Sequence, residues 1–375
     1  MSRKRVTISD VAREAGVSKA TVSAVVNRTG TIAAATRSRV QEVVDRLNYR
    51  PGVPARSPRV EEDPSIGMLI REINNPYHVE VAAGARQEAE ESGYGLMVTS
   101  SAAEYQTERR VVERLLRKDL HGLIINPVLH ESADLSYLYD LKRRGIPHVL
   151  LAGIWGVQAS LVDVDNVEAS RQAVAYLIEQ GHTRIAHLAG PRFSMHSQER
   201  IEGVRRAFSE SHLRFTADVI VPAGSHLEDG YQAGLGLFGS GRDDQRPTAV
   251  TCYNDLVALG LCRALGELSL HVPEDVSVIG YGDLPILEYL PLPLTTVRVP
   301  KFEMGKTAAR MLIRQLRSGA VDAPERVNLE TELVVRRSTR PLGPADASTD
   351  ETRWIELSES PSRPRERKEP RSRKR

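Results

Sequence analysis

The sequence predicts an α/β protein that combines a small all-α headpiece with a two-lobed body built on doubly wound parallel sheets. Three observations support this prediction. Three short helical patterns occupy residues 1–51, a proline-rich stretch follows at residues 52–64, and strand and helix patterns then alternate in two successive sets over residues 65–340. The length of 375 residues allows two or three folded units.

The headpiece pattern is that of two short helices joined by a glycine-containing turn and closed by a third helix. Residues Thr7–Asp10 have the form of a capping box, which marks a helix start. Gly16 suits a turn with positive φ, and Ser18 is a natural N-cap for the second helix. The third helix is expected over residues 37–48. The expected core residues are Val11, Ala12, Ala15, Val22, Val25, Val26, Val40, Val43, Val44 and Leu47. This order is typical of a helix-turn-helix domain.

Basic residues are concentrated in this headpiece. Residues 1–60 hold twelve Lys and Arg against four Asp and Glu, whereas residues 61–340 hold 30 basic and 38 acidic residues. A basic head on an acidic body indicates a polyanionic partner for the head alone. The charge by itself favours such a partner over the alternative, a solvated basic face that binds nothing.

The outward face of the second helix carries small and hydrogen-bonding side chains that suit a DNA major groove. The stretch Val6–Asn27 closely resembles the DNA-binding headpiece of the LacI/GalR family of bacterial transcription regulators. That resemblance implies contacts to DNA phosphates from Thr7, Ser18, Thr21, Asn27, Thr36 and Tyr49, and contacts to bases from Lys19, Ala20, Ser23 and Ala24.

Two headpiece positions depart from the family pattern. Ala24 stands where the family usually has Arg, a bidentate reader of guanine, so the operator should differ at that position. Ala33 stands where the family often has a Ser cap. The third helix is therefore expected to start less firmly, at a cost of about 1 kcal/mol.

Residues 52–64 read as a hinge or linker. In the resembled family this segment folds into a short hinge helix on the operator, and an apolar side chain, usually Leu, enters the minor groove. Here that position is Pro58, which lacks the backbone donor that a helix needs. Either Pro58 itself serves as a shorter wedge, or the hinge stays extended and the headpieces bind with help from Arg56 and Arg59 alone.

The body alternates strand and helix patterns, which predicts parallel sheets. The expected strands of the first set are residues 66–70, 95–99, 122–125 and 147–151, and those of the second set, which begins after residues 161–165, are 184–188, 249–252 and 276–279. The expected helices are residues 79–92, 105–118, 135–144, 169–180, 198–209 and 255–268. Two such lobes imply a cleft between them, beyond the carboxyl ends of the strands, where ligands bind in sheets of this kind.

The body also resembles the periplasmic-binding-protein-like effector domain of the same family. The segments that carry this resemblance are Asn75–His78, Gly181–Pro191, Pro247–Asp255, Val272–Tyr281 and Pro293–Val297. It implies an effector and dimerisation domain over residues 65–340. The first lobe would comprise about residues 65–161 and 293–324, and the second about 162–292 and 325–340.

By the same resemblance, Tyr77 and His78 would contact an effector from the first lobe, and Arg200 and Asn254 from the second. The residues expected to bind the effector are Tyr77, His78, Arg200, Asn254 and Asp283. An arginine fork suits a hydroxylated or anionic ligand. Gly282 stands where the family commonly has an Asp for sugar hydroxyls, so Asp283 is expected to substitute for it, while Ala152 and Ser225 replace a polar and an aromatic residue. Surface or merely buried roles for Arg200 and His78 remain open alternatives.

Other classes of protein lack support in the sequence. No phosphate-binding glycine loop, His-Glu-x-x-His motif or nucleophile elbow occurs, so we expect no enzyme and no cofactor. His182 and His187 lack a third ligand at metal spacing, and Cys252 and Cys262 are expected to be inert core thiols, so no metal site is predicted. Neither a secretion signal nor a membrane span is predicted, which favours a cytoplasmic, nucleoid-associated protein.

The sequence as a whole predicts a DNA-binding transcriptional regulator, typically a repressor, that a small molecule between the lobes controls, a sugar being one candidate. It should bind a pseudo-palindromic double-stranded operator as a homodimer, because residues 341–375 lack the leucine heptads of a tetramerising coiled coil and read as a disordered basic tail. The alternative is an effector-independent or largely non-specific DNA-binding protein with a degenerate cleft.

Overall fold

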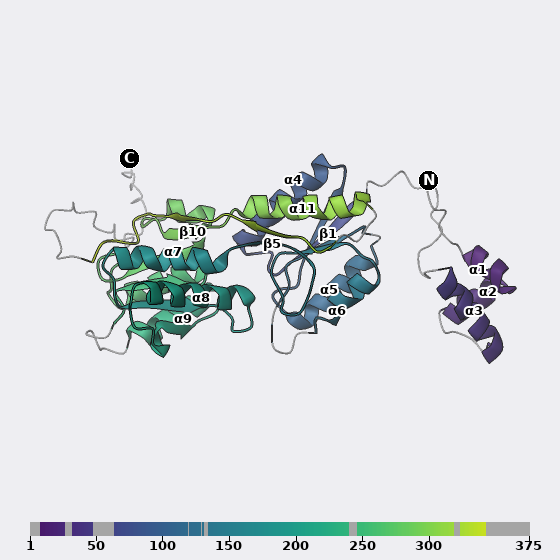
Figure 1. Cartoon of the computed structure of the whole chain (residues 1–375), viewed down its shortest axis with the longest axis horizontal. Coiled ribbons are helices and arrows are strands. Elements are labelled where there is room, and N and C mark those ends of the chain that lie inside the picture. Colours follow the sequence, from purple (N-terminus) through teal and green to yellow (C-terminus); the bar gives the residue numbers. More distant parts are fainter. Residues whose placement is uncertain are drawn as a thin grey trace, which may run out of the picture. The chain divides into compact units, whose positions relative to one another are not determined.

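The computed structural model describes residues 8–26, 32–47, 64–118, 120–128, 130, 134–239, 246–318 and 323–342 (Figure 1). The chain divides into two compact units, residues 1–64 and residues 65–375. In the part of the chain that the structure describes, every helix is too short or too polar to cross a membrane.

The first unit is a three-helix domain. It contains α1 (Ile8–Ala15), α2 (Lys19–Val26) and α3 (Ala34–Arg46), and its buried core is formed by Val11, Ala12, Ala15, Val22, Val25, Val40, Val43 and Val44. Val26 and Leu47, which the sequence also places in the core, pack partly buried against it. The predicted helix order and apolar faces are confirmed, and α3 begins three residues before the predicted position.

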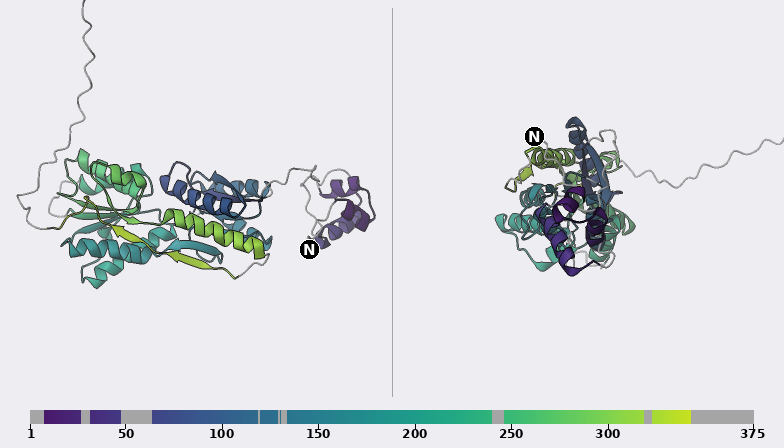
Figure 2. Two further views of the ribbon diagram at one scale, coloured as in Figure 1. Left: turned by 90° about the horizontal axis from the view of Figure 1, so that it is seen from above. Right: turned by 90° about the vertical axis from the view of Figure 1, so that its right-hand side faces the viewer.

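The first lobe of the body is a six-stranded sheet between two layers of helices (Figures 1 and 2). Its strands are β1 (Ser65–Ile70), β2 (Gly95–Ser100), β3 (Leu123–Ile125), β4 (His148–Leu150), β5 (Ser160–Val164) and β11 (Arg326–Leu329), in the spatial order β11-β5-β4-β3-β1-β2. All neighbouring strands are parallel. Helices α4 (Pro76–Glu91) and α11 (Lys301–Ser318) share one core with the sheet, and α5 (Tyr105–Leu116) and α6 (Ser136–Arg143) share the other.

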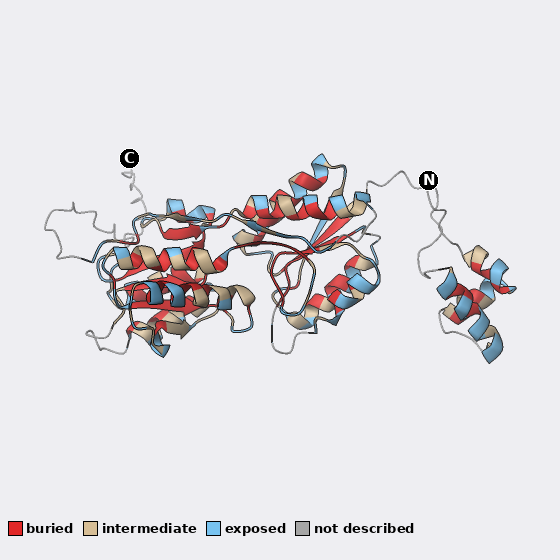
Figure 3. Ribbon diagram, in the orientation of Figure 1, coloured by how far each residue is buried: buried red, intermediate tan, exposed pale blue. Residues whose placement is uncertain are grey.

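The second lobe repeats this plan. Its strands are β6 (Ile185–Ala189), β7 (Ile220–Pro222), β8 (Ala249–Cys252), β9 (Ser277–Gly282), β10 (Thr295–Arg298) and β12 (Glu332–Val334), in the order β12-β10-β9-β8-β6-β7. Only the β10–β12 pair is antiparallel among them. Helices α7 (Asn166–Glu179) and α8 (Met195–Glu210) pack together, as do α9 (Leu227–Phe238) and α10 (Asp255–Glu267). Short 3-10 turns lie at Ala217–Val219 and Pro285–Tyr289. Figure 3 shows the buried residues gathered along the strands and the inner helix faces.

The chain crosses between the lobes at other places than the sequence predicts. Strand β5 completes the first sheet up to residue 164, whereas the predicted boundary is 161. Strand β10 belongs to the second sheet and β11 to the first, contrary to the predicted lobe boundaries at residues 293 and 325, whereas α11 and β12 lie in the lobes predicted for them. Strands β10 and β11 each have only four residues, so their apolar pattern does not reveal which sheet they join.

For three body helices the predicted start is three residues too late, because the prediction did not include the capping residue that precedes each helix. The side chain of Asn75 accepts a hydrogen bond from the backbone N–H of Tyr77 before α4, and that of Asp165 accepts one from Glu168 before α7. Ser194 caps α8 in the same way. Such side-chain oxygens satisfy donors that the first helical turn leaves unpaired.

Candidate DNA-binding helix and effector cleft

The turn before α2 has the geometry expected of a helix-turn-helix. Gly16 has a φ of 64°, in the left-handed region that glycine adopts without strain. Ser18 then caps α2: its Oγ accepts a hydrogen bond from the backbone N–H of Thr21 at 3.1 Å. Ala33 precedes α3 without a side-chain cap, as the sequence predicts. The start of α2 is therefore better fixed than the start of α3.

Helix α2 turns one face to the core and one to solvent. Val22 and Val25 are buried, whereas Lys19 and Ala20 are exposed. The remaining predicted contacts within the described residues are placed as follows: Ser18 is exposed, and Thr21, Ser23, Ala24 and Thr36 are half-buried. The other predicted DNA contacts, which are Thr7, Asn27, Tyr49, Arg56 and Pro58, lie outside the described residues. The described part of the headpiece thus presents a short row of small side chains and one cation.

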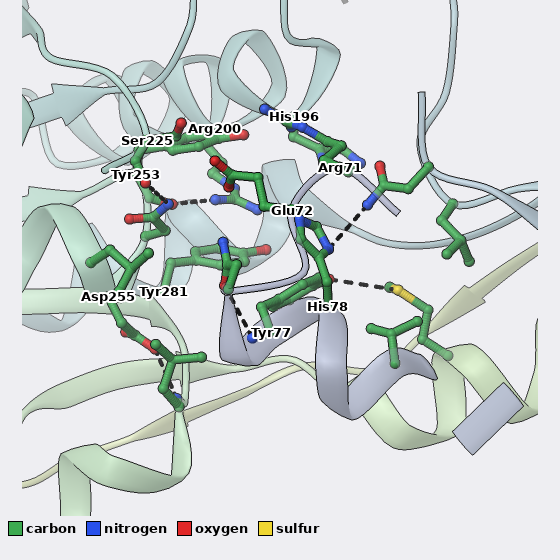
Figure 4. A pocket seen from close by; sticks show the side chains of 18 residues that line it. Arg71, Glu72, Tyr77, His78, His196, Arg200, Ser225, Tyr253, Asp255 and Tyr281 are labelled. Carbon is green, nitrogen blue, oxygen red and sulfur yellow. Dashed lines mark hydrogen bonds between the residues drawn. The ribbon is translucent and has the colours of Figure 1, made fainter. Parts of the chain in front are cut away.

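In the body, a cavity of about 80 Å³ lies between the two lobes (Figure 4). The chain segments that line it follow β1, β3 and β4 of the first sheet and β7 and β8 of the second, with part of β9 and the first turns of α4, α8 and α10. Nearly all of these are carboxyl ends of parallel strands or the helix starts that follow them. The cleft therefore lies where doubly wound sheets place their ligands.

Four of the five predicted effector residues line this cavity: Tyr77, His78, Arg200 and Asn254. The fifth, Asp283, does not. Its backbone takes a left-handed φ of 57°, and its carboxylate accepts hydrogen bonds from Arg298 and Arg336, both at 2.7 Å. Those two guanidinium groups hold the pKa of Asp283 below its usual value although burial opposes this. Asp283 is thus used in a structural ion-pair cluster, and the expectation that it substitutes for a missing sugar-binding Asp is corrected.

Arg200 is held firmly within the second lobe. Its guanidinium stacks on the ring of Tyr281 at 3.5 Å and on that of Tyr253 at 4.7 Å. Its Nε donates to Asn166 Oδ1 at 3.1 Å, and a terminal nitrogen donates to the backbone carbonyl of Tyr253. With only 7% of its surface exposed, Arg200 is not the surface charge that the sequence left open. Its acceptors are neutral, so its positive charge is not cancelled by a carboxylate at hydrogen-bond distance.

The first lobe contributes Tyr77 and His78 from the start of α4. Their rings meet edge to face with centroids 5.4 Å apart, and Asn126 Nδ2 lies 3.3 Å from His78 Nδ1. Burial, together with the nearby charge of Arg71, lowers the pKa of His78 to about 4. A neutral imidazole is therefore offered to the cavity at physiological pH.

The second lobe contributes Asn254 and Asp255 at the start of α10. Asn254 uses its side chain to cap this helix through the N–H of Val257 and to donate to the carbonyl of Ser225. Asp255 is buried, and its carboxylate accepts from Thr296 Oγ1 at 2.6 Å and from the backbone N–H of Leu284 at 2.9 Å. Burial raises the pKa of Asp255 to about 6. Both side chains help to fix the wall of the cleft.

Several polar or aromatic lining residues were not predicted to bind the effector, although Tyr253 and Tyr281 lie within segments that carry the family resemblance. Five of them are Arg71, Glu72, His196, Tyr253 and Tyr281. Arg71 and Glu72 follow directly on the buried strand β1, and Tyr253 follows β8, so a search for polar or aromatic residues just after each strand would have found three of the five. His196 carries no such signal, because its helix start was placed too late.

Two histidine–carboxylate pairs join the lobes. Glu72, after β1, accepts a hydrogen bond from His226 Nε2, before α9, at 2.6 Å. Asp163, in β5, lies 3.1 Å from Nε2 of His196 in α8. Hydrogen bonding to Glu72 raises the pKa of His226, and the Asp163 carboxylate raises that of His196 although burial opposes it. Both pairs are therefore strongest when the imidazole is protonated.

The histidines and cysteines that the sequence analysis considered as possible metal ligands are engaged in contacts within the protein or buried. His182 lies beside Thr248 and the carbonyl of Arg340, and His187 Nδ1 lies 3.0 Å from Thr251 Oγ1. Cys252 and Cys262 are free thiols whose pKa values burial raises. Among the described residues no group of three His, Cys, Asp or Glu side chains is arranged to hold a metal ion.

Comparison with known proteins identifies the family. Residues 7–52 match the bacterial regulatory proteins of the lacI family, and residues 174–339 match the periplasmic binding protein-like domain. The HTH-type transcriptional repressor PurR of Vibrio vulnificus (strain CMCP6) is 36% identical over 340 residues, which cover 90% of this chain and 99% of that protein. The chain belongs to the LacI family.

Solved structures of the LacI family agree in fold over the whole body and headpiece. A complex of the transcriptional regulator CelR with cellobiose has a TM-score of 0.67 and 30% identity, covering 89% of this chain and 100% of the other. The lac repressor dimer bound to operator and an anti-inducer has a TM-score of 0.66 and 27% identity, covering 90% and 100%. The prediction is confirmed: this LacI family protein is a DNA-binding transcriptional regulator with an effector domain, and not an enzyme.

Proposed function

We propose that this regulator is a homodimer that binds a pseudo-palindromic operator through α2 of each headpiece, acts on the nucleoid in the cytoplasm, and responds to a small polar effector in the cleft. The observation that carries this proposal is the cleft itself, where contacts within the protein fix several of the polar lining residues. Two of them, Arg200 and Asn254, are positioned by stacking, hydrogen bonding and helix capping within the second lobe. A degenerate cleft would not need such positioning, so the effector-independent alternative is not favoured.

The proposed effector residues are Tyr77, His78, Arg200 and Asn254, now joined by Tyr253 and Tyr281. The cavity of about 80 Å³ is smaller than the roughly 300 Å³ or more of sites for drug-sized ligands. A ligand of several rings or hydroxyl groups must therefore hold the lobes farther apart than they are here. An effector acts on DNA binding only through its different affinity for the two lobe arrangements.

A footprint of the purified protein on the DNA upstream of its own gene, repeated over a range of salt concentrations, tests the regulator proposal. A protected site with two-fold symmetry is the expected result, since two headpieces of a homodimer read two half-sites. Diffuse coverage that falls steeply with salt would instead indicate binding through phosphates alone and would contradict a sequence-specific operator.

Lys19→Ala is expected to weaken operator binding by about tenfold to a hundredfold, which is the usual cost of about 1–3 kcal/mol for losing a specific contact. Lys19 is the exposed cation at the first turn of α2. Lys118→Ala is the matched control, because Lys118 is an exposed lysine in the body. Fluorescence anisotropy with the footprinted site measures both variants. Equal affinities for the two would remove α2 as the recognition element.

A further inference from the structure

We infer that the effector carries an acidic group, a carboxylate or a phosphate, and that Arg71 of the first lobe binds this group together with Arg200 of the second. This inference rests on the proposed function and specifies the chemistry of the same cleft. The recognition unit is a pair of guanidinium groups, one from each lobe, that face one cavity and lack a carboxylate partner.

Hydrogen bonds from neighbouring residues hold the backbone of Arg71, which fixes the point from which its side chain enters the cleft. Its carbonyl accepts hydrogen bonds from Ser100 Oγ and from the backbone N–H of Ala103, both at 2.8 Å. These contacts tie the end of β1 to the turn that follows β2. The guanidinium then extends into the cleft, where Arg71 lines the same cavity as Arg200 (Figure 4).

Among the described residues Arg71 forms no ion pair, although the carboxylates of Glu72 and Glu108 lie near enough to interact with its charge. Its Nε is buried without a hydrogen-bond partner, and among the described residues no carboxylate lies within 4.0 Å of its guanidinium. A buried donor of a charged group without an acceptor is costly, and proteins seldom retain one without a use for it. An acceptor supplied by a bound ligand would satisfy this group.

The acids near the cavity are already engaged. Glu72 pairs with His226 and Asp163 with His196, so each of these two charges is matched. Asp255 accepts hydrogen bonds from Thr296 and Leu284. Arg200 has only neutral acceptors, the amide oxygen of Asn166 and a backbone carbonyl. Two arginines therefore remain to attract an anion into the cleft.

The pKa of the Tyr253 hydroxyl agrees with an excess of positive charge in the cleft. Burial opposes ionisation of Tyr253, yet Arg200, Arg71 and His196 together lower the pKa of its hydroxyl to about 8. Because Tyr253 belongs to the second lobe, Arg71 acts across the cleft. The arginine charges thus add up at one place, and guanidinium forks match the geometry of carboxylate and phosphate oxygens.

The test compares neutral and acidic compounds of similar shape on the full-length protein by thermal unfolding at constant ionic strength. Suitable pairs are glucose against gluconate, glucose against glucose 6-phosphate, and adenosine against its 5′-monophosphate, with inorganic phosphate as the smallest probe. We expect saturable stabilisation by at least one acidic member or by phosphate, and less by its neutral counterpart. Gluconate and glucose 6-phosphate distinguish a carboxylate from a phosphate.

Arg71→Gln is expected to weaken binding of the acidic compound at least tenfold, whereas Arg71→Lys should keep part of the affinity because it keeps the charge. Arg143→Gln is the matched control, since it removes an exposed charge from the same lobe outside the cleft. The control also accounts for phosphate that binds the basic headpiece. Arg143→Gln leaves the headpiece and the cleft unchanged, so its operator affinity without ligand should match the wild type.

Three results would overturn the inference: equal binding of neutral and acidic members, an unchanged affinity in Arg71→Gln, or no saturable stabilisation by phosphate and every acidic compound. Operator binding separates this failure from failure of the proposed function. A neutral compound that alters operator affinity would leave the regulator intact and reject the acidic effector. An acidic compound that binds through Arg71 without altering operator affinity would support the site and reject its regulatory role.

Discussion

Gly305→Ala is expected to lower the free energy of unfolding of the body by about 3 kcal/mol or to prevent its folding. Helices α4 and α11 cross so closely here that an added Cβ at residue 305 would lie 1.8 Å from the carbonyl oxygen of Val81. On the facing helix, a Cβ at Gly84 would lie 1.9 Å from the carbonyl oxygen of Phe302. Both obstacles are backbone atoms, which cannot rotate away as a side chain can. The helices would have to separate, and overpacking of this kind costs about 1–3 kcal/mol or more.

Gly236→Ala provides the matched control for this substitution. Gly236 lies within α9, and an added Cβ there would meet nothing within 4 Å. Replacing glycine by alanine inside a helix usually stabilises it by about 0.5–1 kcal/mol. Urea unfolding followed by circular dichroism should therefore shift in opposite directions for the two variants. Two equal shifts would mean that α4 and α11 do not approach each other as closely as the structure has them.

The same close packing explains why part of the fold was not predictable from the sequence. Helix α9 contains Gly230, Gly234 and Gly236, which interrupt its apolar pattern and argue against a helix. At Gly230 a Cβ would lie 2.1 Å from the carbonyl oxygen of Val257 on α10, so the glycine is required by contact with a neighbour distant in sequence. Helix α11 and strands β7, β10, β11 and β12 were not predicted either, whereas most of the remaining body helices and strands follow local patterns and were predicted to within about three residues.

The sequence predicts residues of the candidate site where they lie in segments that resemble the family. It does not predict them where a contact with a residue distant in sequence determines whether a side chain faces the cavity. Tyr77, His78, Arg200 and Asn254 line the cavity as expected. Asp283 follows directly on strand β9, but Arg336 and Arg298 engage its carboxylate outside the cavity. Arg71 could be read as an ordinary charge, because only the structure reveals that its Nε is buried without a hydrogen-bond partner and that, among the described residues, no carboxylate lies within 4.0 Å of its guanidinium.

The second large effect is expected at His196, the imidazole that joins α8 to β5 of the other lobe. Its Nε2 lies 3.1 Å and 3.2 Å from the two carboxylate oxygens of Asp163, whose side chain is only 1% exposed. His196→Ala would leave this buried carboxylate with the backbone N–H of Val164 and the distant amide of Asn166 as its donors. Removing one partner of a buried ion pair typically costs about 3 kcal/mol or more, and we expect a loss of that size in the free energy of unfolding.

The pKa shifts of His196 and Asp163 determine how the stability that this pair contributes changes with pH. Burial opposes the charge on His196, but the Asp163 carboxylate outweighs it and raises the pKa of His196. Burial likewise opposes the charge on Asp163, but His196 outweighs it and lowers the pKa of Asp163. The stability from a raised histidine pKa is complete below the unfolded value of about 6.5 and is lost as the pH rises through the folded value. The stability from Asp163 is complete above about 3.9 and is lost as the pH falls through its folded value. The pair therefore contributes most between about pH 4 and 6.5.

Measured from pH 5 to pH 9, the difference in unfolding free energy between wild type and His196→Ala should be largest near pH 6 and shrink as the pH rises. The charged groups that face the pair are Glu199, Arg200 and Arg326, with the Tyr253 hydroxyl beside them. Burial and the Asp163 charge raise the pKa of Glu199, so Glu199 also opposes folding as the pH rises, and it does so more strongly in His196→Ala because the His196 charge lowers that pKa. His271→Ala is the control, because His271 pairs with Asp275 on the surface, where such pairs contribute less than about 1 kcal/mol. A difference between wild type and His196→Ala that stays constant over this range would show that His196 is neutral in the folded protein, and that the link between the lobes does not depend on its proton.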